Sequence, residues 1–465
     1  MLFYIIKKEF QNNIISLRFQ IAFFLVLLLF CIGTFAFINN YKNDSNEYRE
    51  YKQGYLAASK KTAESNLTRF ITEKRNEILE SRSSGFITDS KEKLIPNIFT
   101  NSGYNVFSFK VRNGSTNPYL NKFLELNWVF IVSIIFSFVV FLFTFDAISG
   151  EKESKTLALL LSNTISRSEL LLGKYISTVI TTIFLFIVGI CLSLIIILIS
   201  TEIKITGAMI GEIFAYLFTV ILFVASITSF GMLSSVITHN SNVSLLCALT
   251  FWLAFVVIVP NSAIFWAQKL FPIENRESIE KKVYQSDVDI NRSVSQDAWG
   301  ASSSDPFLPQ HRLRADYKTR LMNSEMQIRN AHYQKMFHQF SRTRIVTFLS
   351  PVSLFEYVCE AIVGGGYLRF QKAWENLHAY QTQLLTFFKA KDAADPASPH
   401  WYNPYEDYST TRKPVKFEEV PLFQEKIISF GERFSFASIY IVVMVLYTAL
   451  VFFLTYVLFV KYDVR

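Results

Sequence analysis

The sequence is short of charge. Only 18% of its 465 residues are charged, whereas 51% are hydrophobic, including 46 phenylalanines. A soluble domain has about one quarter charged residues, so this composition indicates a membrane protein. The net charge of +8 is spread along the chain without any dense basic tract. This argues against nucleic-acid binding and favours anchoring at the cytoplasmic membrane face.

Cysteine is scarce as well. Three of the four cysteines, Cys31, Cys191 and Cys247, lie inside apolar runs, where cysteine serves as a small hydrophobe. Cys359 is then the only one expected in a soluble region. The sequence therefore offers neither an intrachain disulfide there nor a zinc site.

The motifs of an enzyme are also missing. The run from Gly150 to Thr156 lacks the second glycine of a phosphate-binding P-loop and follows an apolar run instead of a strand. The six histidines show no metal-type pairing with cysteine. Carboxylates outside the apolar runs fall on patterned helices, where they usually form solvated faces. We therefore predict no catalytic residue, no metal ligand and no directly bound cofactor.

Six apolar runs are each near the roughly 20 residues that a membrane-spanning helix requires. The predicted spans are 19–39, 127–147, 175–200, 212–237, 243–267 and 434–460. None carries Asp, Glu, Lys or Arg near its centre, where ion-coupled transporters usually need such groups. Pro260 and Asn261 are expected to interrupt the fifth helix, either as a hinge or as the point where it leaves the membrane.

Charges in the short loops predict the orientation. Basic residues gather on one side of the six runs, and the short loop on the other side offers Lys204. The first group comprises Lys7, Lys8, Arg18, Lys152, Lys155, Arg167, Lys174, Lys461 and Arg465. The positive-inside rule places both termini, the loop 148–174 and the tail 461–465 in the cytoplasm. Residues 1–18 are predicted to form an amphipathic helix, which either lies in the interface or extends the first membrane helix.

Two long segments then lie outside the cell membrane. Residues 40–126 are predicted to form an α+β domain, with a helical pattern at 46–81 and a strand at 104–111. Residues 268–431 are predicted to form a mainly helical domain. Its helices are expected at 274–299, 311–346 and 352–389, with breaks at Pro351 and at Gly364-Gly-Gly366.

The loop 148–174 carries the strongest functional signal. Glu151 and Lys155 are spaced as an i, i+4 ion pair, which supports a helix there. The pattern then breaks, and Ser166-x-x-Glu169 is a capping box that leads into the next apolar run. The first helix carries three leucines on one face, and this apolar face must pack against another surface: Leu157, Leu160 and Leu161.

Such a helix either lies passively on lipid or docks in the groove of a protein partner. A lipid-facing helix is typically richer in cations on its polar face. Glu151 and Glu153 instead alternate with Lys152 and Lys155, a mixture that suits a protein groove better. We therefore expect this helix to bind another protein.

These residues resemble the membrane subunits of ATP-binding-cassette exporters, the ABC type-2 permeases. The pattern of that family is an acidic residue after the second membrane helix, then Gly-Thr-Leu, a leucine run, Pro-Ile-Ser-Arg and Leu-Gly-Lys. The matching residues here are Glu151, Glu153, Thr156-Leu157, Leu159-Leu-Leu161, Ile165-Ser-Arg167, Glu169-Leu170 and Leu172-Gly-Lys174. Lys155 replaces the glycine, and Thr164 stands where proline is common. Six spans and a large outer domain before the last span also resemble a bacterial subgroup of this family.

The resemblance implies partners and a mechanism. A separate ATPase, which holds the ATP and magnesium, would receive the 151–161 helix in a groove, and its movement would tilt the second and third membrane helices. A second permease, identical or paralogous, would complete a dimer in a bacterial cell membrane. The implied interface with the ATPase comprises Glu151, Lys152, Glu153, Lys155, Thr156, Leu157, Leu160, Leu161, Arg167 and Glu169.

The sequence thus predicts a mainly α polytopic membrane protein with cytoplasmic termini and two extracytoplasmic domains. The favoured function is a permease subunit that couples ATP hydrolysis in a partner chain to export or to mechanical transmission across the membrane. The alternative is a membrane-anchored scaffold or sensor whose extracytoplasmic domains bind a protein partner, which would explain why so much of the chain lies outside.

Overall fold

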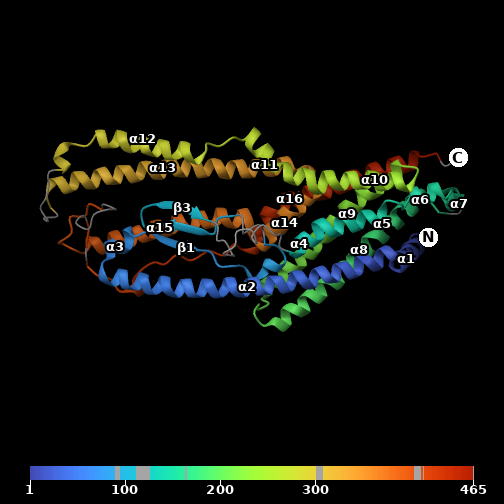
Figure 1. Ribbon diagram of the computed structural model, residues 1–465, viewed down its shortest axis with the longest axis horizontal. Helices are drawn as coiled ribbons and strands as arrows, with labels where there is room; N and C mark the ends of the chain where they lie inside the picture. The colour runs from blue at the N-terminus through green and yellow to red at the C-terminus, as the bar shows by residue number, and fades with distance from the viewer. Residues whose placement is uncertain are drawn as a thin grey trace.

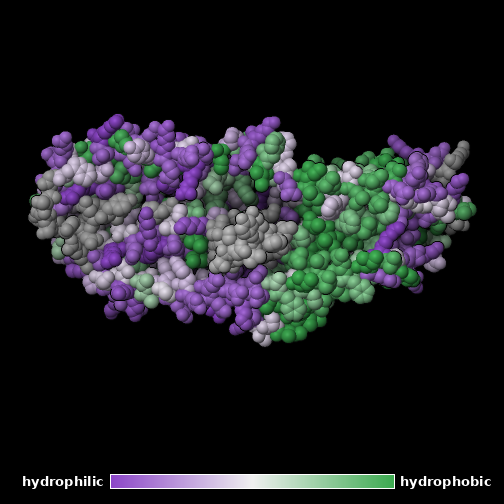
Figure 2. Space-filling model, in the orientation of Figure 1, coloured by the Kyte–Doolittle hydropathy of each residue, from purple (hydrophilic) through white to green (hydrophobic). Residues whose placement is uncertain are grey.

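The protein is an elongated, mainly helical molecule (Figure 1). The computed structural model describes residues 1–89, 95–110, 126–162, 165–299, 307–402, 410–411 and 413–463. An apolar band covers its membrane helices, with hydrophilic surface at both ends (Figure 2). The large hydrophilic end, formed by the described residues of 40–110, 271–346 and 366–428, is called the polar domain below. The small hydrophilic end includes the described residues of the loop 148–174, which we call the tip.

Six helices in the described part of the chain are long and apolar enough to cross a membrane. They are α2 (Leu17–Ser65), the run from α4 to α6 (Trp128–Glu153), α8 (Arg167–Ser200), α9 (Gly207–Ile237), the run from α10 to α11 (Ser241–Leu270) and α16 (Phe430–Lys461). Each predicted span falls on one of them. Figure 1 places the N-terminus and the end of α16 at the same end of the molecule as the tip.

The first membrane helix continues far beyond its predicted end. Its 49 residues make α2 about 74 Å long, whereas the hydrocarbon layer is about 30 Å thick. The polar domain predicted to begin at residue 40 therefore begins inside a helix. The helix predicted at 46–81 is confirmed up to Ser65, but its predicted end is wrong. The Asn66 side chain caps the short α3 (Leu67–Thr72), after which the chain is no longer helical up to Ser81.

A small antiparallel sheet follows α3, with the strand order β1-β2-β3. The strands are β1 (Arg75–Ile78), β2 (Ile98–Asn101) and β3 (Val106–Lys110). The strand predicted at 104–111 is confirmed as β3, although Val111 lies outside the described residues. Phe99 of β2 stacks on Phe370 of α15 (Gly366–Ala393), with ring centroids 6.1 Å apart. The two outer segments, predicted as separate domains, thus share one hydrophobic cluster.

The second outer segment is helical, as predicted. A hairpin of α12 (Arg276–Arg292) and α13 (Pro309–Val346) lies along one side of the polar domain (Figure 1). Glu274, just before α12, forms ion pairs with Lys282 and, at 3.0 Å, with Lys335 of α13. Hydrogen bonds from these two lysines lower the pKa of Glu274 to about 2.

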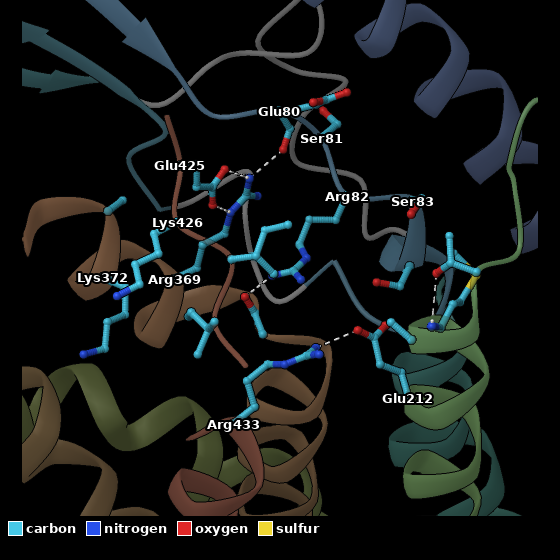
Figure 3. Close-up of a pocket in the computed structure, with 18 of the residues that line it drawn as sticks. Glu80, Ser81, Arg82, Ser83, Glu212, Arg369, Lys372, Glu425, Lys426 and Arg433 are labelled. Carbon is cyan, nitrogen blue, oxygen red and sulfur yellow. Dashed lines mark hydrogen bonds and ion pairs between the residues drawn. The ribbon is translucent and has the colours of Figure 1, made fainter. Parts of the chain in front are cut away.

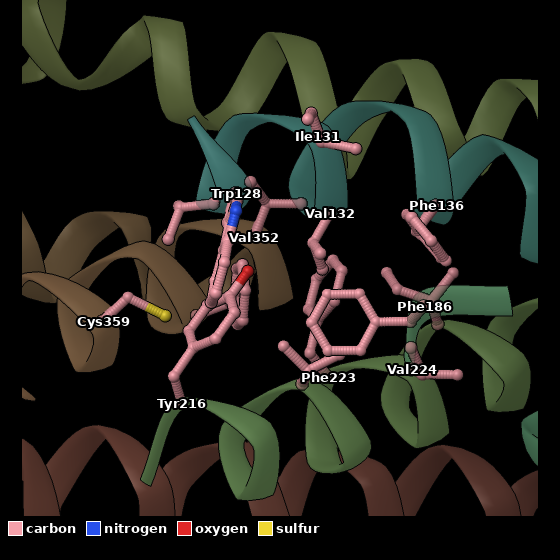
Figure 4. Packing of buried hydrophobic residues seen from close by; sticks show 14 of the residues in the cluster. Trp128, Ile131, Val132, Phe136, Phe186, Tyr216, Phe223, Val224, Val352 and Cys359 are labelled. Carbon is pink, nitrogen blue, oxygen red and sulfur yellow. The ribbon is translucent and has the colours of Figure 1, made fainter. Parts of the chain in front are cut away.

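One helix of that segment belongs to the membrane bundle instead. The 13 residues of α14 (Pro351–Val363) are about 20 Å long, too short to span a bilayer, and they are almost entirely buried among the membrane helices. Phe355 stacks on Phe223 of α9 at 4.5 Å between ring centroids. Cys359 lies near Tyr216 and Trp128 (Figure 4). The expectation that Cys359 lies in a soluble region was therefore wrong.

The break predicted at Gly364-Gly-Gly366 within 352–389 is confirmed. Gly364, with a φ of +69°, ends α14 in the left-handed conformation that glycine adopts without steric cost. A Cβ at this position would lie 2.6 Å from the Arg433 side chain. The chain therefore leaves the membrane bundle here and continues as α15 into the polar domain.

The fifth membrane helix is not interrupted at Pro260. The chain stays helical from Ser241 to Leu270, through α10 (Ser241–Trp252), a π-helical segment (Leu253–Ile258) and α11 (Val259–Leu270). Proline has no N–H and its ring crowds the carbonyl four residues earlier, so the widened segment accommodates it. The Asn261 side chain donates to the Val257 carbonyl at 2.7 Å. A hinge at this place stays a prediction.

Candidate functional site

The tip contains two short helices where the sequence predicted one. They are α6 (Ser149–Glu153) and α7 (Thr156–Ser162), separated by Ser154 and Lys155. Lys155 has a φ of +58°, a backbone conformation that glycine adopts far more readily than lysine. This is the position where the related permease pattern carries glycine.

The predicted pair between Glu151 and Lys155 does not form, because the chain turns between the two residues. Glu151 instead accepts a hydrogen bond from the Thr156 hydroxyl and lies 3.3 Å from Lys174 Nζ. The side chain of Lys155 is exposed. Glu151 therefore stabilises the interior of the tip, while Lys155 faces outward.

The leucine face of α7 is covered by the chain itself. Leu157 is only 2% exposed, and Leu160 and Leu161 pack against the cluster to which it belongs. The other buried members of this cluster are Ile148, Leu170, Leu171, Val236 and Phe459. Leu159, two residues after Leu157, is 68% exposed. We call the outward face of the tip, formed by Glu153, Ser154, Lys155, Ala158, Leu159 and Ser162, the exposed tip surface.

The predicted capping box is present at the start of α8. The Ser166 hydroxyl accepts from the Glu169 N–H at 3.2 Å, and the Glu169 carboxylate accepts from the Ser166 N–H at 3.1 Å. Arg167 beside it donates to the carbonyls of Phe459, Val460 and Tyr462 at distances of 3.2, 2.6 and 2.8 Å. A guanidinium at these last carbonyls stabilises the end of α16.

The remaining charged residues of α6 contact two further helix ends. Lys152 donates to the carbonyls of Val236 and Thr238, the latter at 3.0 Å, at the end of α9. The Glu153 carboxylate accepts from the N–H of Ser241 at 2.9 Å, at the start of α10. Both contacts put a charge of the appropriate sign at a helix end. The tip is thereby attached to the loop between the fourth and fifth membrane helices.

The sequence did not predict the contact of the tip with the N-terminal helix. Lys174 is 7% exposed and lies 2.9 Å from Glu9 as well as 3.3 Å from Glu151. Glu9 belongs to α1 (Leu2–Ile15), the amphipathic helix predicted at 1–18, which packs along α8. A Cβ at Gly173 would lie 2.6 Å from Ile5, so glycine permits this close approach. The Leu172-Gly-Lys174 motif was the available signal, but nothing in it identifies Glu9 as the partner.

The fold defines a multi-pass α-helical membrane protein. A match to a family model identifies the protein family. The model of the ABC-2 family transporter proteins matches residues 3–464, nearly the whole chain, and the chain belongs to this family. It is therefore a permease of an ABC transporter, a class whose members have an ABC ATPase as partner. No curated protein matches the chain.

Proposed function

We propose that the tip couples a separate ABC ATPase, which binds ATP and magnesium, to the membrane helices of this permease. The observation that carries the proposal is the set of polar contacts made by the tip. Lys152, Glu153 and Arg167 each contact the end of a different membrane helix, and Glu151 contacts α1 through Lys174. A displacement of the tip by the ATPase would therefore act on α1, α8, α9, α10 and α16 together.

The proposed contact with the ATPase is the exposed tip surface. Leu159 supplies an exposed apolar side chain and Lys155 and Glu153 supply charges beside it, the combination that suits a helix docking in a protein groove. Of the residues expected at this interface, Leu157 serves instead to anchor α7. The internal contacts of Glu151, Lys152, Arg167 and Glu169 give them a positioning role in the same proposal.

In this proposal the tip and both termini are cytoplasmic and the polar domain is extracytoplasmic. The positive-inside distribution of the loop charges supports this orientation, as does the common position of the tip and the chain ends (Figure 1). Two permease chains, identical or paralogous, form the transporter. The movement driven by ATP exports a substrate or transmits force to the polar domain, which offers a surface for an extracytoplasmic protein partner.

The test is co-purification of the permease with a co-expressed ABC ATPase. Leu159→Asp places a charge on the exposed tip surface and should abolish stoichiometric recovery of the ATPase while leaving the thermal stability of the permease unchanged. Leu313→Asp is the matched control, since Leu313 is 40% exposed on α13 in the polar domain. Full ATPase recovery with Leu159→Asp would contradict the proposed interface. Recovery of polar-domain partners alone would favour a scaffold or sensor.

A further inference from the structure

A cavity of about 390 Å³ lies where the polar domain meets the membrane helices (Figure 3). Its walls come from five parts of the chain: Tyr41 of α2, 80–84 after β1, 206–212 at the start of α9, 364–373 from the end of α14 into α15, and 425–433 before and within α16. Nothing in the proposed coupling mechanism uses this cavity. It is therefore a candidate for a second function.

Two ion pairs form part of the wall, and the first of them is buried. Arg433 Nη1 lies 2.6 Å from Glu212 Oε1, with the two side chains 6% and 7% exposed. Arg369 donates twice to the Glu425 carboxylate, at 2.7 and 2.8 Å. Both carboxylates are thus occupied by arginine. The Nε of Arg433 is buried without a hydrogen-bond partner in the described structure, so the wall still has an unused donor.

The charges of the cavity are unbalanced in favour of cations. Its lining contains five basic side chains, Arg82, Arg369, Lys372, Lys426 and Arg433, and three acidic ones, Glu80, Glu212 and Glu425. Lys372 and Lys426 both line the cavity and are labelled in Figure 3. Lys372 pairs with Glu375 on its own helix at 2.9 Å, whereas Lys426 has no partner in the described part of the chain. The excess of positive charge favours an anionic ligand.

The cavity also has an apolar edge that continues into the membrane band. Ile427 lines the cavity and is 85% exposed. Phe430 and Phe434 follow it on the first turns of α16, both exposed, with ring centroids 6.2 Å apart. A large apolar side chain that is exposed beside cations, at the edge of the membrane region, indicates a ligand with an anionic group and an apolar part.

We propose that this cavity binds an anionic phospholipid of the adjoining leaflet. The phosphate group lies between Lys372 and Lys426, and the acyl chains leave past Ile427 along the exposed phenylalanines of α16. The cavity is large enough for a lipid headgroup but not for the chains, which remain in the bilayer. Since the same cations would also attract free phosphate esters, the test separates the two sources. The proposal does not depend on the ATPase partner.

The experiment measures lipid binding to the purified full-length permease by native mass spectrometry. The probes are a phosphatidylglycerol and a phosphatidylcholine with the same short acyl chains, and glycerol phosphate without chains. Lys372→Ala/Lys426→Ala is compared with Lys61→Ala/Lys281→Ala, a pair of exposed lysines of the polar domain outside the cavity. Each lysine near an anionic headgroup raises the affinity for an anionic lipid roughly fivefold. The wild type should therefore bind phosphatidylglycerol at least tenfold more tightly than phosphatidylcholine.

The cavity variant should lose most of this preference, and the control variant should keep it. Equal binding of the two lipids by the wild type would overturn the proposal, as would an unchanged preference in the cavity variant. Glycerol phosphate binding as tightly as phosphatidylglycerol would overturn the assignment to a lipid. Thermal unfolding of both variants checks that they are folded. Because none of these measurements includes an ATPase, failure here is distinguishable from failure of the coupling proposal.

Discussion

Leu157 and Leu159 are two residues apart on α7, yet the structure predicts opposite consequences for their replacement by alanine. Leu157→Ala removes a buried side chain from the cluster that anchors α7, and a buried leucine truncated in this way costs about 3 kcal/mol. A helix of seven residues has no stability of its own, so the cost should appear as local opening of Thr156–Ser162. Leu159→Ala, on the exposed face, should change stability by less than about 0.5 kcal/mol.

Hydrogen exchange at the backbone amides of Thr156–Ser162 measures this opening directly. A loss of about 3 kcal/mol corresponds to roughly 100-fold faster exchange in Leu157→Ala, whereas Leu159→Ala should exchange at the wild-type rate. Amides of α9 serve as an internal control, since global unfolding would accelerate them as well. Equal exchange rates in the two variants would refute the conclusion that the chain covers its own leucine face.

Three further outcomes follow from the packing and charges. Gly173→Ala should lower the thermal stability by about 1–3 kcal/mol, because its Cβ would press on Ile5 and displace α1, whereas Gly211→Ala, with open space around it, should not. Lys155→Gly should raise the stability of the tip by about 1 kcal/mol, measured as slower amide exchange there, because it relieves the positive φ. The lowered pKa of Glu274 means that its ion pairs stabilise the fold above pH 4.5 and are lost as the pH falls to about 2. Glu274→Gln should therefore lose less thermal stability than wild type between pH 6 and pH 3.

The membrane helices and the helix cap of the tip could be predicted from the sequence because their signals are local. An apolar run of sufficient length stays helical in a bilayer, and Ser166 and Glu169 are only three residues apart. The turn at Gly364 was equally readable, since glycine is the residue that ends helices in the left-handed conformation. Each of these predictions depends on residues within a few turns of one another.

The other features depend on contacts between distant segments. Glu9 and Lys174 are 165 residues apart, and only the folded chain shows that α1 packs on α8. A mostly apolar helix of thirteen residues such as α14 fits the core of either a soluble or a membrane protein, and the packing on Phe223 decides between them. The turn at Lys155 could not be predicted for a different reason. Glycine at this position would have indicated a positive φ, but this chain carries lysine there.

The continuity of α2 has a mechanical consequence. About 26 of its residues lie beyond the predicted membrane span, which makes a projecting rod of about 39 Å. If α2 pivots by 10° within the bilayer, the far end of this rod sweeps through about 7 Å, since a helix without an interruption does not absorb the rotation by bending. A lever of this kind converts a small angular change among the membrane helices into a stroke of several ångströms at the far edge of the polar domain.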